Sequence, residues 1–194
     1  MVAEEKGGYE RDEAALAEAR QKVYGVFDEL GIPYEVFDHP PIHSAAERKS
    51  KGIVVDGAIC KNLFLCNKER TRYYLFVLPL DKRADLKALQ SALGETRLSF
   101  GDADMLWELL RITPGSVSLL NIIGAYGETG VAEAAAAADV PVKPPLKFLI
   151  DAETLAVPRI GLHPNDNAAT IVFSAERLPD ILGRYGAEFA FLNI

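Results

Sequence analysis

Residues 57–67, "GAICKNLFLCN", decide the fold, because they form the clearest strand in the chain and a second strand follows them closely. The second strand, "RYYLFVL" at 72–78, is equally apolar, and "NKERT" at 67–71 has the length of a hairpin connection. Both strands carry apolar residues on both faces, which is typical of a central position in a sheet. Lys61 and Asn62 nevertheless stand in the middle of the first strand.

The segments on either side of this hairpin alternate between helical and extended patterns. Helical spacing predicts helices at 12–30, 81–94, 102–111 and 174–186, and a short one near 44–51. Further strands are predicted at 33–38, 97–100, 146–151, 159–163, 169–173 and 187–194. Three side chains are predicted to cap helices, namely Ser44 (in a capping box with Glu47), Asp102 and Ser174.

Hairpins mixed with helices predict an α+β (mixed α/β) fold, and no repeat or clean boundary divides the chain. We therefore expect one domain over residues 1–194, which is an ordinary length for a single core. Within it, residues 1–11 are expected to be flexible, and the Ala- and Pro-rich stretch 127–145 is expected to be an insertion.

Composition excludes several classes of protein. Apolar residues make up 49% and charged residues 25% of the chain, as in globular proteins, and no apolar run is long enough for a membrane helix. The net charge of −7 argues against a broad grip on DNA, although recognition of one phosphate or one nucleic-acid end stays open. The acidic, polar first residues resemble no targeting signal, so we expect a cytoplasmic protein without a membrane partner.

Lys61 and Asn62 raise the main question, because strand alternation sends their side chains to opposite faces. An unpaired charge in a dry core is disfavoured by several kcal/mol, so Lys61 must reach water, a carboxylate or an anionic ligand. Spacing alone modestly favours a lysine that extends to solvent. Asn62 shares its face with Cys60 and Phe64 and could be a hydrogen-bonded core amide. Cys60 and Cys66 lie about 20 Å apart along one strand, too far for a disulfide, and are expected to pack as apolar residues.

Other polar stretches have a functional and a structural interpretation. His163 precedes a proline in "GLHPND" at a strand end, where a site residue and a surface-loop histidine are equally expected. "TPGSVS" at 113–118 could expose backbone N–H groups to an anion, although an ordinary turn is favoured on local sequence. "RKSK" at 48–51 reads equally as a solvated basic tip or a small phosphate grip. "HPPIH" at 39–43 is better explained as a turn than as a metal site, and no nucleotide, zinc-protease or serine-hydrolase motif is present.

In order along the chain, "HPP", "GAICKNLFL", "DLKALQSALG", "RLSFG", "LLRITPGSVS", "FLID" and "GLHPNDNAAT" form a more specific set than any one of them. This set resembles the YbaK/ProX family of free-standing aminoacyl-tRNA deacylases from about Val23 to the C-terminus, and it is most similar to the ProX branch. The resemblance implies a curved, mainly antiparallel sheet with flanking helices. It also implies trans-editing hydrolysis of mischarged tRNA, with alanyl-tRNA(Pro) as the expected substrate and with no cofactor or metal.

Matching positions imply a catalytic group of Lys61, Asn62, Gly115 and His163. By this resemblance, Lys61 is expected to hold the tRNA 3′ end near its phosphate. Backbone N–H groups of 115–118 are expected to face the ester carbonyl, and His163 and Asn62 to orient water or the substrate amine. The expected substrate-binding residues are Ile42, Phe64, Ser116, Val117, Ser118 and Asn167. Leu119 departs from the family, which usually has proline there. Nothing beside Cys60 suggests an activated thiol, so it is not expected to be a nucleophile.

The implied partner is the 3′ end of an aminoacyl-tRNA, with prolyl-tRNA synthetase as a further one, and a monomer is expected by default. Two alternatives stay within tRNA biology, namely a deacylase for cysteinyl- or seryl-tRNA and a non-catalytic regulator that binds aminoacyl-tRNA. A third is an interaction module in which residues 131–145 cover the cleft.

Overall fold

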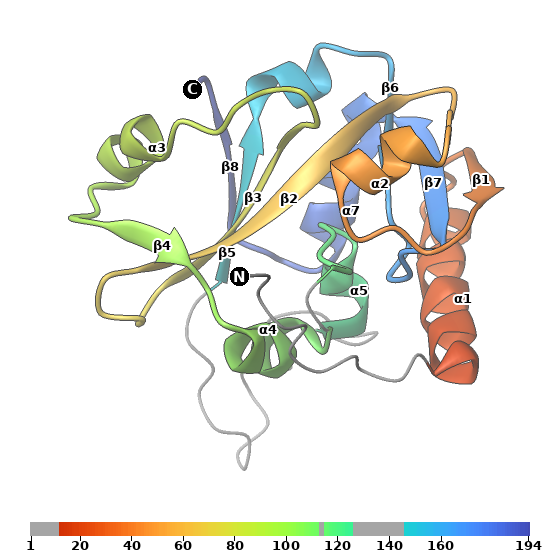
Figure 1. The fold of residues 1–194 in the computed structure, drawn as a ribbon, viewed down its shortest axis with the longest axis horizontal. Helices are drawn as coiled ribbons and strands as arrows, with labels where there is room; N and C mark the ends of the chain where they lie inside the picture. The colour runs from red at the N-terminus through yellow and green to blue at the C-terminus, as the bar shows by residue number, and fades with distance from the viewer. Residues whose placement is uncertain (1–11, 113–114, 126–145) are drawn as a thin grey trace.

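The structure is a computed structural model, and it describes residues 12–112, 115–125 and 146–194 (Figure 1). The predicted flexible start at 1–11 lies outside these ranges. So do the predicted insertion at 127–145, with its 131–145 part, and the first two residues of the 113–118 turn. The predictions made for those segments therefore stay predictions.

The central feature of the fold is an eight-stranded sheet in the order β1-β7-β6-β2-β3-β5-β8, with β4 paired to β2. Its strands are β1 (Tyr34–Asp38), β2 (Ala58–Asn67), β3 (Tyr73–Pro79), β4 (Leu98–Phe100), β5 (Leu146–Asp151), β6 (Arg159–Leu162), β7 (Ala169–Ser174) and β8 (Phe189–Leu192). The opening stretch of the sequence is β2, which pairs with β3, β4 and β6 and so joins the two halves of the sheet. Its central position explains why it is apolar on both faces.

The sheet is mixed, as the predicted fold class requires. Four strand pairs are antiparallel, namely β1·β7, β2·β3, β2·β4 and β6·β7. Three pairs are parallel, namely β2·β6, β3·β5 and β5·β8. The expected antiparallel preference therefore holds by a single pair, because β3, β5 and β8 run side by side in one direction.

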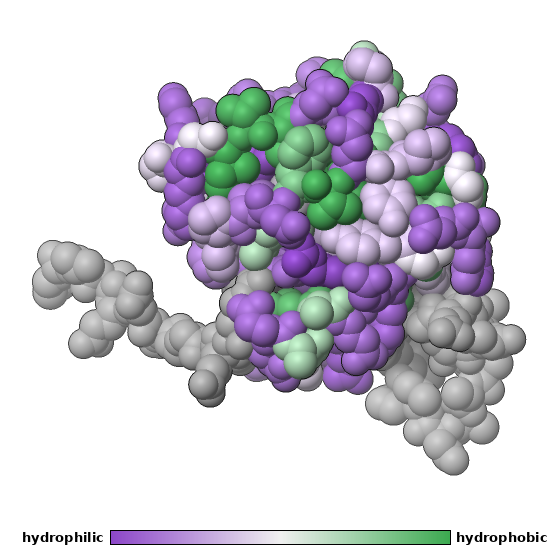
Figure 2. All heavy atoms as spheres, turned by 90° about the vertical axis from the view of Figure 1, so that its right-hand side faces the viewer, coloured by the Kyte–Doolittle hydropathy of each residue, from purple (hydrophilic) through white to green (hydrophobic). Residues whose placement is uncertain are grey.

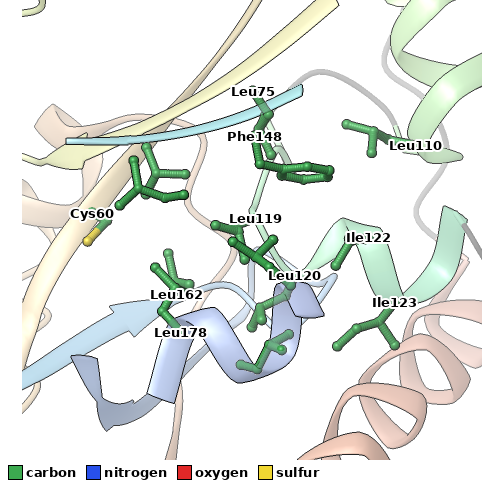
Figure 3. Close-up of a cluster of buried hydrophobic side chains, with 14 of the residues drawn as sticks. Cys60, Leu75, Leu110, Leu119, Leu120, Ile122, Ile123, Phe148, Leu162 and Leu178 are labelled. Carbon is green, nitrogen blue, oxygen red and sulfur yellow. The ribbon is translucent and has the colours of Figure 1, made fainter. Parts of the chain in front are cut away.

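Helices cover both faces of the sheet, but unequally. The helical elements are α1 (Glu13–Glu29), α2 (Ala45–Ser50), α3 (Leu86–Leu93), α4 (Ala103–Leu110), α5 (Asn121–Ala125), η1 (Ala152–Leu155), η2 (Ala175–Arg177) and α7 (Leu178–Arg184). Buried residues of α1, α4, α5 and α7 join Cys60 and Phe64 of β2 in the larger core, whereas α3 packs with Leu65 on the opposite face. Figure 3 shows part of the larger core, in which Leu119 and Leu120 lie between Phe148 and Leu178.

Two of the three predicted caps are confirmed. The Ser44 side chain accepts from the Glu47 N–H, and Asp102 accepts from the Met105 N–H. The predicted capping box is shifted by one residue, because Glu47 accepts from the N–H of His43 instead of Ser44. The Ser174 prediction is wrong: its side chain makes no cap hydrogen bond, because β7 leads into the turn η2 before α7 begins.

The surface on the α1 and β1 side of the molecule is mostly hydrophilic (Figure 2). Hydrophobic residues nevertheless form a group on the upper half of this face and a smaller group on its lower half (Figure 2). Exposed apolar residues can also form contacts between copies of a chain, so the expected monomer stays a prediction. Within the described ranges, no helix combines the length and apolar character that crossing a bilayer requires.

Candidate active site

A cavity of about 250 Å³ brings together residues from five separate parts of the chain, namely 42–48, 59–62, Leu80, 115–117 and His163. β2 contributes Lys61 and Asn62, the 115–117 loop contributes Gly115 and Val117, and the end of β6 contributes His163. The remaining described lining residues are Ile42, His43, Ser44, Ala45, Arg48, Ile59, Cys60 and Leu80. All four residues of the predicted catalytic group therefore line one cavity, together with Ile42 and Val117 of the predicted substrate-binding set.

Lys61 keeps its charge available for a ligand. Its Nζ donates to the carbonyl oxygen of Leu80 at 2.8 Å, and among the described residues it forms no ion pair with a carboxylate. A neutral carbonyl compensates only part of the charge, so an anion in the cavity would still bind favourably. The structure thus excludes a carboxylate partner within the described ranges and keeps the ligand interpretation of Lys61 open.

Asn62 points to the opposite face of β2, as alternation predicts, yet it lines the same cavity as Lys61. Its Oδ1 accepts from the backbone N–H of Leu119 at 3.2 Å. A proline at position 119 would lack this N–H, so the departure from the family pattern supplies a hydrogen bond that ties the loop to β2. The Leu119 side chain is fully buried in the core. Asn62 therefore positions the loop and has an amide group that borders the cavity.

The loop from Gly115 to Ser118 presents unpaired backbone groups. Among the described residues, none accepts from the N–H of Gly115, Ser116 or Val117. The N–H of Ser118, by contrast, donates to Asn121 Oδ1 at 2.5 Å. Three consecutive donors in a turn can stabilise an anion or a developing oxyanion. Gly115 adopts a φ of +95°, which only glycine adopts without strain.

Two buried asparagines hold this loop against the segment that follows β6. Asn121 Nδ2 donates to Asn165 Oδ1 at 2.9 Å, and both side chains are buried. Asn165 has a φ of +59°, which asparagine tolerates better than most residues. Sequence reasoning missed this pair, because a buried amide is visible only once its partner from a distant segment is in place.

His163 is held as a neutral acceptor. Its Nδ1 lies 2.8 Å from the carbonyl oxygen of Ala169, and since a carbonyl can only accept, Nδ1 carries the proton and Nε2 keeps a lone pair. Burial, together with the neighbouring His39 and Arg48, lowers the pKa of His163, although the Ala169 carbonyl and Asp166 oppose this. The ring therefore stays uncharged near neutral pH and can accept a hydrogen bond from water.

Two residues of the predicted substrate-binding set lie in a neighbouring, larger hollow. This hollow has a volume of about 750 Å³ and is lined by Ser116 and Asn167, among others, and His43 borders both hollows. Asn167 Nδ2 lies 3.3 Å from His43 Nδ1. The larger hollow is mostly apolar, whereas the predicted polar groups meet in the smaller one, so we place the site there.

Phe64 and Ser118 do not line either hollow. The Phe64 ring is buried and stacks on Tyr73 with centroids 5.5 Å apart. Ser118 is fully buried, and its Oγ accepts from the Leu120 N–H at 3.3 Å. Both residues shape the core and the loop in this structure, and neither contacts the cavity space.

The chemistry of this cavity does not depend on a thiol. Cys60 and Cys66 are free and buried, which confirms that they form no disulfide with each other. Burial raises the pKa of the Cys60 thiol from 9.0 to about 12, so it remains protonated and unreactive at neutral pH. In the described ranges, no group of three or more His, Cys, Asp or Glu side chains could hold a metal ion. The cavity therefore offers two cations, a neutral imidazole, an amide and N–H groups without a partner among the described residues. This set suits attack by a positioned water on an activated carbonyl.

Comparison with known proteins shows the family of this chain. Residues 39–181 match the aminoacyl-tRNA editing domain family. The prolyl-tRNA editing protein ProX of Acetoanaerobium sticklandii is 32% identical over 177 residues, which cover 91% of this chain and 98% of that protein. The mouse prolyl-tRNA synthetase associated domain-containing protein 1 is 27% identical and covers 84% of this chain and 88% of its own.

The fold has solved counterparts as well. A crystal structure of a candidate trans-editing enzyme for prolyl-tRNA synthetase aligns with a TM-score of 0.58 at 21% identity, covering 91% of this chain and 97% of that one. At this identity the likeness concerns the fold, whereas the sequence match concerns the family. The chain belongs to the aminoacyl-tRNA editing domain family and is an aminoacyl-tRNA deacylase.

Proposed function

We propose that the protein hydrolyses alanine from mischarged proline tRNA in trans, in the cytoplasm, and so protects the fidelity of translation. The observation that carries this proposal is the single cavity that joins Lys61, Asn62, Gly115 and His163, in a chain similar to ProX over most of its length. Prolyl-tRNA synthetase would supply the mischarged substrate and is the proposed partner. We expect the protein to act as a monomer.

The proposed reaction uses binding and positioning. Lys61 holds the 3′-terminal nucleotide, and the N–H groups of Gly115 to Val117 donate hydrogen bonds to the ester carbonyl oxygen as negative charge develops on it. His163 takes a proton from the attacking water through Nε2. An aminoacyl ester is already activated, so orientation and oxyanion stabilisation can supply the required acceleration without a covalent intermediate.

Substrate choice follows from the size of the cavity. Ile42 and Val117 form apolar parts of its wall. We expect a methyl side chain to fit beside them, whereas a larger one would have to displace them. Attraction to a single methyl group discriminates weakly, since each methylene contributes about 1–3 kcal/mol, so exclusion of larger side chains is the more effective device. Cysteine and serine are similar to alanine in size and are the competing substrates.

A deacylation panel tests the function. Proline tRNA charged with alanine, cysteine, serine or proline is incubated with the protein, and release of each amino acid is followed against a protein-free sample. We expect alanine to be released fastest and proline at least about tenfold more slowly, since its ring adds bulk that the wall excludes. Release of none would favour the non-catalytic regulator, and faster release of cysteine or serine would reassign the substrate.

Replacing Gly115 by alanine should impair both the loop and the cavity. The added methyl group would lie 2.8 Å from His43 Nδ1, and the φ of +95° would be strained by about 1–3 kcal/mol. We expect a lower free energy of unfolding in urea and a deacylation rate that falls at least about tenfold. Gly186→Ala is the matched control, because its φ of +60° is also strained but nothing lies within 4 Å. Equal losses of activity in the two variants would remove Gly115 from the site.

A further inference from the structure

Arg48 is a buried cation that the proposed reaction does not use. Its side chain is 7% exposed, and Nη1 makes one long hydrogen bond, of 3.4 Å, to Thr170 Oγ1. Nη2 is buried without a hydrogen-bond partner. Among residues 12–112, 115–125 and 146–194, no carboxylate forms an ion pair with it. A guanidinium stays protonated at neutral pH, so this arrangement leaves a buried charge uncompensated, which is strongly unfavourable unless a ligand completes it.

Arg48 lines the same cavity as Lys61, and none of the described lining residues is a carboxylate. His39 and His163 add no charge at neutral pH, because burial lowers the pKa of both, and His43 also borders the cavity. A protein of net charge −7 therefore places two permanent cations around about 250 Å³ of space. Such a cavity favours an oxyanion over any neutral or cationic group.

The position of Arg48 also shows how such an oxyanion would be connected to the rest of a ligand. Arg48 belongs to α2 and begins the basic run 48–51, whose Lys49 and Lys51 are exposed. Lys51 is partly used, since its Nζ donates to the carbonyl oxygen of Pro41 at 2.6 Å. Lys51 Nζ also lies 3.8 Å from Glu47 Oε2, which leaves Lys49 as the exposed cation next to Arg48 along the chain. A nucleic-acid backbone carries negative charge at successive positions, whereas an isolated carboxylate on an amino-acid side chain does not.

We propose that Arg48 and Lys61 together bind the last phosphodiester of the RNA, the one that joins the two terminal nucleotides, between a planar guanidinium and an ammonium. The proposal rests on the proposed function, because it assumes that an RNA 3′ end enters this cavity. It makes Arg48 a binding residue of the site and explains why its Nη2 has no hydrogen-bond partner among the described residues. Guanidinium groups bind phosphate oxygens in pairs of parallel hydrogen bonds, which would fix the terminal nucleotide more tightly than one lysine can.

The test uses an RNA minihelix that ends in CCA and carries no amino acid. It is made once with a normal final phosphodiester and once with an electrically neutral methylphosphonate at that position. Dissociation constants are measured by fluorescence anisotropy for the wild type, Arg48→Met and Lys49→Met. We expect the methylphosphonate to weaken wild-type binding about tenfold or more, and Arg48→Met to weaken binding of the normal RNA by a similar factor. In Arg48→Met the methylphosphonate should have a clearly smaller effect. Lys49→Met should weaken both RNAs by the same small factor.

Three results would overturn the proposal. The first is wild-type affinity of Arg48→Met for the normal RNA. The second is that the methylphosphonate weakens binding by Arg48→Met by the same factor as binding by the wild type, because independent effects would mean that Arg48 does not contact this phosphate. A third arm compares minihelices that carry alanine or aspartate through a stable 3′-amide. The third result is that Arg48→Met loses affinity for the aspartyl minihelix alone, which would assign Arg48 to the carboxylate of the aspartyl group.

Thermal unfolding separates binding from a structural role. Replacing an uncompensated buried charge by methionine should raise the melting temperature of Arg48→Met above that of the wild type, while Lys49→Met should leave it unchanged. A lower melting temperature with full RNA affinity would make Arg48 a structural residue. RNA without an amino acid contains no aminoacyl ester, so this test does not depend on hydrolysis. A protein that deacylates alanyl-tRNA but binds the normal and the methylphosphonate RNA equally well would overturn this inference and leave the proposed function intact.

Discussion

Replacing Lys61 by methionine is expected to lower the rate constant for deacylation, kcat/KM, by about 10- to 100-fold, which corresponds to the 1.5–3 kcal/mol of a hydrogen bond to a charged group. The physical reason is that the Lys61 ammonium has no carboxylate partner among the described residues, so its charge is available for the substrate. Methionine keeps an apolar stem of similar length and thus removes the charge while disturbing packing little.

Stability provides the contrast for this variant. Lys61→Met removes one hydrogen bond, from Nζ to the Leu80 carbonyl, so the free energy of unfolding should fall by only about 1 kcal/mol. Lys147→Met is the matched control, because Lys147 is also a strand lysine but pairs with Glu188 and does not line the cavity. Activity is measured with alanyl-tRNA(Pro), and stability by urea unfolding. Activity within twofold of the wild type would remove Lys61 from the site.

Replacing His163 by alanine is expected to reduce kcat about 100-fold or more, in the range observed for a lost general base. The wild-type pH profile should carry the signature of this ring. Burial lowers the pKa of His163 from 6.5, so the neutral form that can accept a proton persists as the pH falls through 6.5. The rate due to His163 should therefore stay constant from pH 8 to below 6.5 and decline only at lower pH.

His39 supplies the control for this prediction. Its ring centroid lies 6.1 Å from that of His163, but it does not line the cavity, and its Nε2 lies 2.9 Å from Thr170 Oγ1. His39→Gln should retain most of the activity and the same profile. Single-turnover rates between pH 5 and 8, corrected for spontaneous hydrolysis, give both comparisons. A wild-type midpoint at or above 6.5, or an unchanged rate in His163→Ala, would contradict the assigned role.

Much of the local structure could be predicted from the sequence, because it depends on neighbours along the chain. The hairpin of β2 and β3 follows from two apolar runs around a short polar connection, and the Asp102 cap follows from a carboxylate before a helical pattern. The parallel pairing of β3, β5 and β8 could not be predicted in this way, because their partners are far apart in sequence. The Ser174 prediction was wrong because periodicity does not show that a 3₁₀ turn precedes α7.

The same distinction between local pattern and long-range contact applies to the residues of the site. Residue spacing modestly favours a solvent-facing Lys61 and leaves His163 undecided, whereas the family resemblance predicts both in one site, and the structure brings them to one cavity. The basic run that Arg48 begins reads equally as a solvated tip or a small phosphate grip, and only the lining of the cavity singles out Arg48. The role of Leu119 was equally hidden, since its N–H acquires meaning only beside the Asn62 amide. Burial and long-range partners, which require the folded chain, therefore supplied what residue patterns did not.

The most direct test of the central claim is a single-turnover experiment with protein in excess over alanyl-tRNA(Pro) at pH 7. If the cavity between β2, the 115–117 loop and His163 is a deacylase site, alanine is released in one exponential phase. Its rate should be at least about 100-fold above the spontaneous rate, and Lys61→Met should slow it. Release at the spontaneous rate by a correctly folded wild-type protein would contradict the account.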